Sequence, residues 1–467
     1  MNFFNSKGFP SFNIRTVPHW ITLALCTLSA VLYGVWILPH TVFIRHTSMG
    51  IGSLLGLWVI YVNYPLLLQK RALPIALVAL LIAWITIHLF LFGKDFPSQY
   101  NEYTKIWKKI IICFPFAVGL GISLLSQSAN SARSNLYWRI IFFGLLLPAL
   151  IYFIKLVATF LAHKYGFWLP RHLQLDADQM GSQFGISRAW YVFYCLPALA
   201  ISLGIILMKI KEQSFRFLDQ LIYVLCIPLT LLIFFIENDR LGALLGSVMV
   251  LLACLYICIY LKNKLRLSIY VLSLLAFLLA IGFMLASIKQ NPQWSSLVSD
   301  ITVAVVDIDH NSVWRNPEVS LENWPKNSLG QPAHSTNYLR ASWAIAGARL
   351  VFEHPLGYGL LSLSFGRLLK EKWPTSEASW SHSAWLDFTL GYGIPGFLLL
   401  AGALLFSWKF NASTQSPWWL IGRLGLPVFA TAFLVKEISA EAFLGTLIFF
   451  ILFTSALSLK INSVDQK

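Results

Sequence analysis

The sequence predicts an all-α polytopic membrane protein with about twelve transmembrane helices and one large, partly helical loop that faces the outside. Three observations carry this prediction. Of the 467 residues, 57% are hydrophobic and only 12% are charged, whereas about 25% of the residues in a soluble domain are charged. Twelve apolar stretches are long enough to span a bilayer. The more polar residues 288–385 separate the ninth stretch from the tenth.

The apolar stretches are expected to be helices, because a spanning segment needs about 20 apolar residues and must satisfy its backbone polar groups internally. They lie at about 20–38, 48–68, 72–92, 108–126, 140–162, 189–208, 219–237, 241–261, 267–287, 386–408, 418–436 and 439–459. This pattern divides the chain into three parts. Helices 1–9 fall within residues 1–287 with an outer loop at 163–188, the large loop covers 288–385, and helices 10–12 fall within 386–467.

The orientation follows from the Lys and Arg residues, which are enriched in the cytoplasmic loops of membrane proteins. With a cytoplasmic N-terminus, every inner segment holds at least one basic residue. These residues are Lys7, Arg15, Lys70, Arg71, Arg133, Arg139, Lys209, Lys211, Arg216, Lys262, Lys264, Arg266, Lys409, Lys460 and Lys467. Lys105, Lys108 and Lys109 are the exception, since they begin the fourth helix on the outer side. We therefore expect both termini in the cytoplasm and both long loops outside.

Charge and cysteine content exclude several classes of partner. The net charge of +15 is explained by orientation and by anionic membrane lipids, and no basic and aromatic platform for nucleic acid is visible. All six Cys lie inside apolar runs, where they act as small hydrophobes. The sequence holds no HExxH or Walker motif. No metal site and no cofactor are therefore expected.

The large loop contains one clear helical pattern, at residues 337–354. Its expected caps are Ser335 and Thr336, and its expected stops are Pro355, Gly357 and Gly359. Arg340 is the ligand candidate on this helix, with a solvated helix face as the alternative. Arg349 points to the opposite face and can pair with Glu353 four positions on. His354 returns to the face of Arg340, but about 21 Å along the axis.

The second candidate segment, 381–387, lies where the large loop meets the tenth helix. Histidine has an unperturbed pKa near 6.5, which suits His382 to accept a proton at neutral pH. The alternative is a histidine that anchors the helix at the interface, beside Trp380 and Trp385. Asp387 is expected to orient His382 or to bind an arginine of the loop, because a carboxylate at a membrane edge is usually paired. The following glycines and proline of residues 391–396 are expected to kink the helix.

Two further arginines are expected at the outer surface, namely Arg240 after the tight turn at 237–239 and Arg188 at the start of the sixth helix. Each either extends toward the lipid headgroups or binds a phosphate. Several arginines with few acids beside them suggest an anionic substrate. The planar guanidinium suits a diphosphate, because it donates two parallel hydrogen bonds.

Together these segments resemble the O-antigen ligase and polymerase family, which has about a dozen membrane helices, a GT-C-like fold and one large periplasmic loop near the C-terminal end. The matching residues are Arg340, Trp343, Ala344, His354-Pro355-Leu356-Gly357, Ser381-His382, Asp387 and Gly393-Ile394-Pro395-Gly396. The resemblance is close over residues 340–400 and elsewhere rests on helix number and topology. Residues 381–387 look more like the ligase branch, since in the polymerase branch the His is usually followed by Asn.

The resemblance implies an enzyme of the bacterial inner membrane that works at the periplasmic face. Such a ligase transfers O-antigen polysaccharide from undecaprenyl pyrophosphate to a sugar hydroxyl of the lipid A-core, and the reaction is expected to be metal-independent and inverting. By the same resemblance, catalytic roles are expected for His382, Arg340 and Arg240, and substrate-binding roles for Arg188, Asp387 and His354. No surrounding motif supports the assignment of Arg188.

Alternatives remain open at this point. An O-antigen polymerase, or an oligosaccharyltransferase that acts on protein hydroxyls, uses the same donor and differs in its acceptor. A secondary transporter with twelve helices is the non-enzymatic alternative. Transporters often show internal repeats, which this sequence lacks, and a loop as long as 288–385 is unusual in them. The identity of the sugars, the acceptor, the oligomeric state and the role of the 163–188 loop are not determined by the sequence.

Overall fold

The computed structural model describes residues 15–127, 131–176, 183–260, 267–316, 324–412, 414, 417–436 and 441–460. Within these ranges the secondary structure is helical apart from one isolated bridge between Lys326 and Pro332. The all-α prediction is therefore confirmed for the described chain. Several basic residues used for the predicted orientation lie outside the described residues, as do both termini: Lys7, Lys262, Lys264, Arg266 and Lys467. Their cytoplasmic position stays a prediction.

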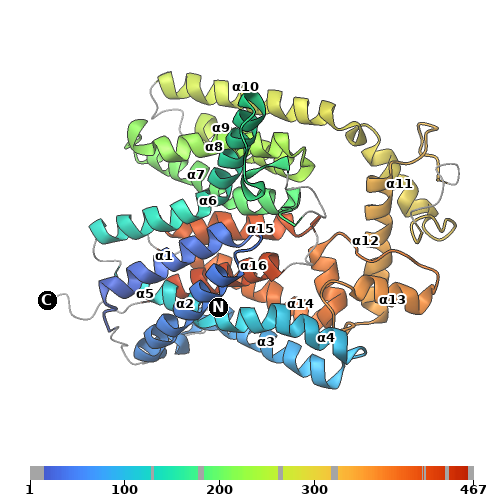
Figure 1. Ribbon diagram of the computed structural model, residues 1–467, viewed down its shortest axis with the longest axis horizontal. Coiled ribbons are helices and arrows are strands. Elements are labelled where there is room, and N and C mark those ends of the chain that lie inside the picture. Colours follow the sequence, from blue (N-terminus) through green and yellow to red (C-terminus); the bar gives the residue numbers. More distant parts are fainter. Residues whose placement is uncertain are drawn as a thin grey trace, which may run out of the picture.

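The bundle contains most of the helices. They are α1 (His19–Val35), α2 (Val42–Asn63), α3 (Leu73–Leu91), α4 (Phe96–Glu102), α5 (Lys108–Ser126), α6 (Ser131–Tyr165), α7 (Arg188–Lys211), α8 (Leu221–Ile236), α9 (Arg240–Tyr260), α10 (Leu267–Gln290), α14 (Ala384–Asn411), α15 (Leu426–Ala432) and α16 (Glu441–Leu457). Short 3-10 segments are Tyr64–Leu68, Lys70–Ala72, Arg171–Leu173, Leu218–Gln220 and Pro292–Trp294, and π-helical turns are Tyr103–Trp107 and Ile421–Gly425. Figure 1 shows the long helices running side by side.

Nine helical segments of the described chain are long and apolar enough to cross a membrane. Three shorter apolar helices occupy the other predicted spans: α1, residues 421–432 and α16. Each predicted stretch thus coincides with a helix, while a total of twelve spans stays a prediction. The π-turn at 103–107 joins α4 to α5, so Lys105, Lys108 and Lys109 lie within one continuous helical segment.

The segment between α10 and α14 forms a loop domain, residues 291–316 and 324–383, that lies at one end of the bundle (Figure 1). It contains α11 (Leu297–Asp307), α12 (Ser335–Glu353) and α13 (Ser364–Lys372). A separate cluster of buried apolar and aromatic side chains holds these helices together, including Trp314, Tyr338, Trp343, Phe365 and Leu368. Burial of such large aromatic groups is the main stabilising term of a small domain. The large loop is therefore partly helical, as predicted.

Helix α12 confirms the predicted helix but corrects two details. Its N-cap is His334, whose Nδ1 accepts from the Thr336 backbone N–H at 3.3 Å, rather than Ser335 or Thr336 itself. Arg349 donates to Asp309, in the turn that follows α11, with Nη1–Oδ1 and Nη2–Oδ2 distances of 2.5 and 3.1 Å. The Asp309 carboxylate offers both oxygens to the guanidinium fork, whereas Glu353 accepts from Lys372 Nζ at 2.5 Å and acts on Arg349 only through its charge.

Helix α14 is kinked where the sequence predicts it. Gly393 has φ 71° and ψ −179°, a left-handed conformation that L side chains rarely adopt. The loop that follows α12 fills the break: the Ile394 N–H donates to the Pro355 carbonyl at 2.8 Å, and the Tyr358 N–H donates to the Leu390 carbonyl at 2.8 Å. A Cβ on Gly393 would lie 2.4 Å from the Pro355 oxygen, so the close approach requires glycine.

Candidate functional site

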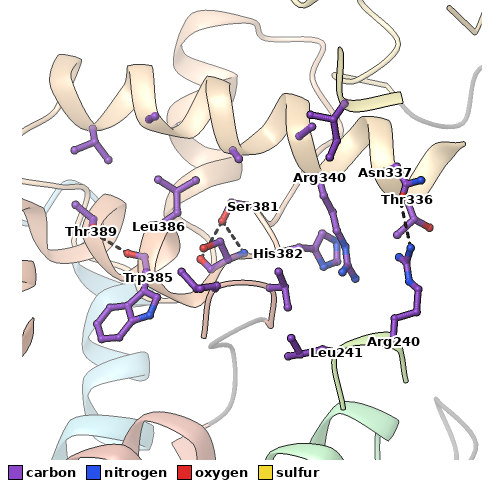
Figure 2. A pocket seen from close by; sticks show the side chains of 18 of the residues that line it. Arg240, Leu241, Thr336, Asn337, Arg340, Ser381, His382, Trp385, Leu386 and Thr389 are labelled. Atoms are coloured by element: carbon purple, nitrogen blue, oxygen red, sulfur yellow. Dashed lines mark hydrogen bonds between the residues drawn. The ribbon is translucent and has the colours of Figure 1, made fainter. Parts of the chain in front are cut away.

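A cavity of about 860 Å³ lies between the loop domain and the bundle. Its walls come from the start of α9, from α11, α12 and α14, and from Leu434 and Val435. Figure 2 shows Arg240, Arg340 and His382 reaching toward it from separate segments. Among the described residues that line the cavity, these three are the charged or titratable ones, and no carboxylate is among them. The predicted convergence of these side chains is thus observed.

Arg240 is placed by the tight turn between α8 and α9. Asn238 adopts φ 50°, and its side-chain oxygen accepts from Asn291 Nδ2 at 2.6 Å. Asp239 caps α9 through the Gly242 N–H at 2.8 Å and also pairs with Lys436. Asp239 is thus paired with a lysine, and the Arg240 guanidinium lines the cavity.

Arg340 enters the cavity from α12. Ala341, Ala344 and Ala348 line the cavity on the same helix. Their small side chains leave the volume that larger residues would fill. Arg349 is half exposed, pairs with Asp309 and is not part of the lining, so the predicted separation of the two arginines onto different faces is observed. The geometry favours Arg340 over Arg349 as a ligand for a bound anion.

His382 sits in the turn that leads into α14. Its ring stacks on the indole of Trp343, with centroids 5.1 Å apart and planes 20° apart. Its backbone has φ 57°, which costs about 1–2 kcal/mol in a residue other than glycine. The turn is held by Asp387, whose Oδ1 accepts from the Ser381 hydroxyl at 2.6 Å and from the Ser381 N–H at 3.2 Å. A strained residue that the surrounding structure holds in place is typical of functional sites.

The cationic residues lie beside a largely apolar wall. The lining includes Leu241, Leu244, Ile301, Leu386, Phe397 and Leu398. Three lining side chains are strongly exposed, namely Phe352 at 81%, Leu398 at 62% and Leu434 at 58%. Of these, Leu398 lies on α14, a helix long and apolar enough to cross a membrane, and is expected to contact lipid. A cavity with a cationic part and an apolar part suits an anion that is attached to a lipid chain.

The loop-domain histidine His334 adds no positive charge to the site. Burial lowers the pKa of His334 below its ordinary value; the Asp300 carboxylate opposes this effect, and the positive charge of Arg240 adds to it. His334 therefore stays neutral at neutral pH and does not add to the charge. The positive charge of the site comes from guanidinium groups, which remain charged at all relevant pH values.

Residues 224–401 match the family model described as O-antigen ligase. This region is similar to the O-antigen ligase family. It contains Arg240, Arg340 and His382. No curated protein matches the chain significantly.

The family match and the apolar helices together indicate a multi-pass membrane enzyme of the glycosyltransferase-like ligase or polymerase type. The family match favours this class over the secondary transporter.

The other residues expected at the functional site, Arg188, His354 and Asp387, lie outside the lining of the cavity. Arg188 is 70% exposed, and its Nε lies 3.8 Å from Glu237, which also accepts from the Tyr152 hydroxyl at 2.7 Å. His354 ends α12, and its carbonyl accepts from the Gly357 N–H at 2.9 Å. Asp387 is buried and accepts a hydrogen bond from the Ser381 hydroxyl, next to His382. Their geometry favours roles in positioning or folding.

Sequence reasoning missed Asn337, which lines the cavity, and Lys436, which does not. Asn337 accepts from Arg240 Nη1 at 3.2 Å (Figure 2). Asn337 precedes Arg340 by three positions, so helical spacing alone places it on the same face. Lys436, the partner of Asp239, had no such signal, because its contact joins segments far apart in the chain.

Proposed function

We propose that this protein is a glycosyltransferase that transfers O-antigen polysaccharide from undecaprenyl pyrophosphate to a sugar hydroxyl of the lipid A-core. We place the reaction at the periplasmic face of the bacterial inner membrane. One observation carries the proposal: Arg240, Arg340 and His382 come from three separate parts of the chain and line one cavity whose remaining wall is mostly apolar.

The donor fits this cavity by its chemistry. Its diphosphate takes hydrogen bonds and charge from Arg240 and Arg340, since a guanidinium can bind two phosphate oxygens at once. Arg240 donates one hydrogen bond to Asn337, and its remaining N–H groups are directed to the phosphates. The polyprenyl chain follows the apolar lining toward the exposed residues Leu398 and Leu434.

The transfer step is a single displacement. The oxygen of an acceptor hydroxyl attacks the anomeric carbon, and its proton passes to the imidazole of His382. The bond between the anomeric carbon and the phosphate oxygen breaks, and undecaprenyl pyrophosphate leaves with the electron pair. Arg240 and Arg340 stabilise the negative charge that grows on this leaving group. Attack from the side opposite to the leaving group inverts the anomeric centre.

The proposal is tested with the purified full-length protein in lipid nanodiscs, in the presence of a chelator. The donor is undecaprenyl-pyrophosphate-linked glycan, and the acceptor is lipid A carrying its core sugars. We expect glycan attached to the core together with an equal amount of released undecaprenyl pyrophosphate. Lipid A that lacks the core serves as the matched control and should remain unmodified.

Other products would overturn the assigned acceptor. Long polymer that stays on the lipid carrier would indicate the polymerase. Glycan attached to a protein hydroxyl would indicate the protein oligosaccharyltransferase. Loss of transfer with chelator, restored by a divalent cation, would contradict the assignment of the cationic role to the two arginines.

A further inference from the structure

A buried carboxylate in the loop domain has no part in the proposed chemistry. Asp300 in α11 is fully buried. Its oxygens accept from the Ser296 hydroxyl at 2.7 Å, from Asn327 Nδ2 at 2.9 Å and from Asn337 Nδ2 at 2.9 Å. Burial raises the pKa of Asp300, but these hydrogen bonds outweigh burial, and the pKa lies below its ordinary value. The group is therefore an anion held by neutral donors.

The contacts of Asn337 determine which way its amide points. Its Nδ2 donates to Asp300 Oδ2 at 2.9 Å and to the Gln293 carbonyl at 2.8 Å. Both amide hydrogens are thus used, and the side-chain oxygen is left to accept from Arg240 Nη1 at 3.2 Å. The opposite orientation would place the amide oxygen against two acceptors and the amide nitrogen against a guanidinium.

We propose that Asp300 and Asn337 are positioning residues for Arg240: Asp300 orients the amide of Asn337, and the Asn337 oxygen holds the guanidinium of Arg240 in the cavity. This inference rests on the proposed function, in which Arg240 binds the pyrophosphate. The network joins α11 and α12 of the loop domain to the first residue of α9. Since Asn337 and Arg340 lie three positions apart on one helix, α12 sets the spacing between the two phosphate-binding arginines.

The alternative is that Asp300 and Asn337 only stabilise the loop domain. The two roles predict different donor binding when Asn337 or Asp300 is removed together with Arg240. If the network acts through Arg240, removing Asn337 has no further effect on donor binding once Arg240 is gone. If the network only stabilises the domain, the two effects add, as they do for independent sites.

The experiment measures binding of undecaprenyl pyrophosphate to the full-length protein in nanodiscs. The variants are Asn337→Ala, Asp300→Asn and Arg240→Ala, and the double variants that combine Arg240→Ala with each of the other two. A hydrogen bond to a charged group typically contributes enough to change an affinity about 10- to 100-fold. We expect Asn337→Ala and Asp300→Asn each to weaken binding by about 10-fold, and to have no further effect when Arg240 is already alanine.

Asp309→Asn is the matched control, because Asp309 is an exposed carboxylate of the same domain that pairs with Arg349 outside the cavity. It should leave binding unchanged. Thermal unfolding of every variant identifies any loss of folded protein, and Asn337→Ala keeps the test valid if Asp300→Asn does not fold. Unchanged binding in folded Asn337→Ala, or additive effects in the double variants, overturns the positioning role alone. Unchanged binding in Arg240→Ala overturns the proposed function and this inference with it.

Discussion

Two short segments of the same family pattern have different physical roles in this protein. Residues 381–387 contribute His382 to the cavity, whereas residues 354–359 contribute mainly backbone groups to the break in α14. In the proposed reaction, the first segment works through the side chain of His382. The second works through N–H and carbonyl groups that join the loop domain to a bundle helix. A shared pattern therefore indicates a shared family but does not separate ligand contacts from structural contacts.

Further contacts fix the second segment against the bundle. His88 Nε2 hydrogen-bonds to the Leu356 carbonyl at 2.8 Å, and Gln99 Nε2 donates to the Tyr358 carbonyl at 2.6 Å. Glu102 accepts from the Leu361 N–H at 2.5 Å. Side chains of α3 and α4 thus bind the loop after α12, and this loop in turn is hydrogen-bonded to α14. The comparison predicts that changes to His382 affect transfer, and that changes which disturb the backbone contacts between residues 354–359 and α14 affect stability.

The largest effect is expected from His382→Ala. Loss of a general base typically lowers a rate by about 100- to 10,000-fold. Transfer to the lipid A-core should fall by this amount, while binding of undecaprenyl pyrophosphate and the thermal midpoint stay near those of the unchanged protein. Single-turnover transfer and binding are measured on the same preparation. Normal transfer by this variant would reject the assignment of His382 as the base.

The second-largest loss of transfer is expected from Arg340→Lys. Lysine keeps the charge but loses the two parallel donors of the guanidinium, so transfer should fall by about 10- to 100-fold. The matched control is Arg349→Lys on the same helix, which pairs with Asp309 away from the cavity and should transfer normally. Equal rates for the two variants would argue against bidentate binding of the diphosphate by Arg340.

Gly393→Ala tests the contact between residues 354–359 and the break in α14. A left-handed conformation in a residue other than glycine costs about 1–3 kcal/mol, and the new Cβ would also meet the Pro355 oxygen. We expect a lower thermal midpoint, recorded by tryptophan fluorescence in nanodiscs. Gly402→Ala on the same helix is the control, because its Cβ would meet only a Leu77 methyl group at 3.5 Å. A similar midpoint for both variants would show that the break in α14 tolerates a side chain.

The smallest effect is expected from His354→Ala. The side chain of His354 lies outside the cavity lining, and the contacts that end α12 are made by its backbone. Surface substitutions away from special features usually change stability by less than about 0.5 kcal/mol. Transfer and thermal midpoint should therefore stay close to those of the unchanged protein. A loss of transfer comparable to that of His382→Ala would place His354 in the chemistry and remove the contrast between the two segments.

Local features of the sequence predicted much of the fold. The position of each long helix, the kink at Gly393 and the helix that carries Arg340 follow from apolar length, from glycine and proline, and from helical spacing. The cap of α12 was predicted wrongly, and the hydrogen-bond partner of Arg349 was not foreseen. His334 and Asp309 make these contacts because the surrounding loop brings their side chains within hydrogen-bonding distance.

The sequence by itself determined the helical architecture, the large loop and the identity of the residues Arg240, Arg340 and His382 as candidates, because these depend on neighbours within a few turns of the chain. Only the tertiary structure decided that these side chains share one cavity and that Arg188, Asp387 and His354 do not line it. It also decided the orientation of the Asn337 amide. The reason is physical: a hydrogen bond between Arg240 and Asn337 spans 97 positions, and its geometry depends on how whole helices pack.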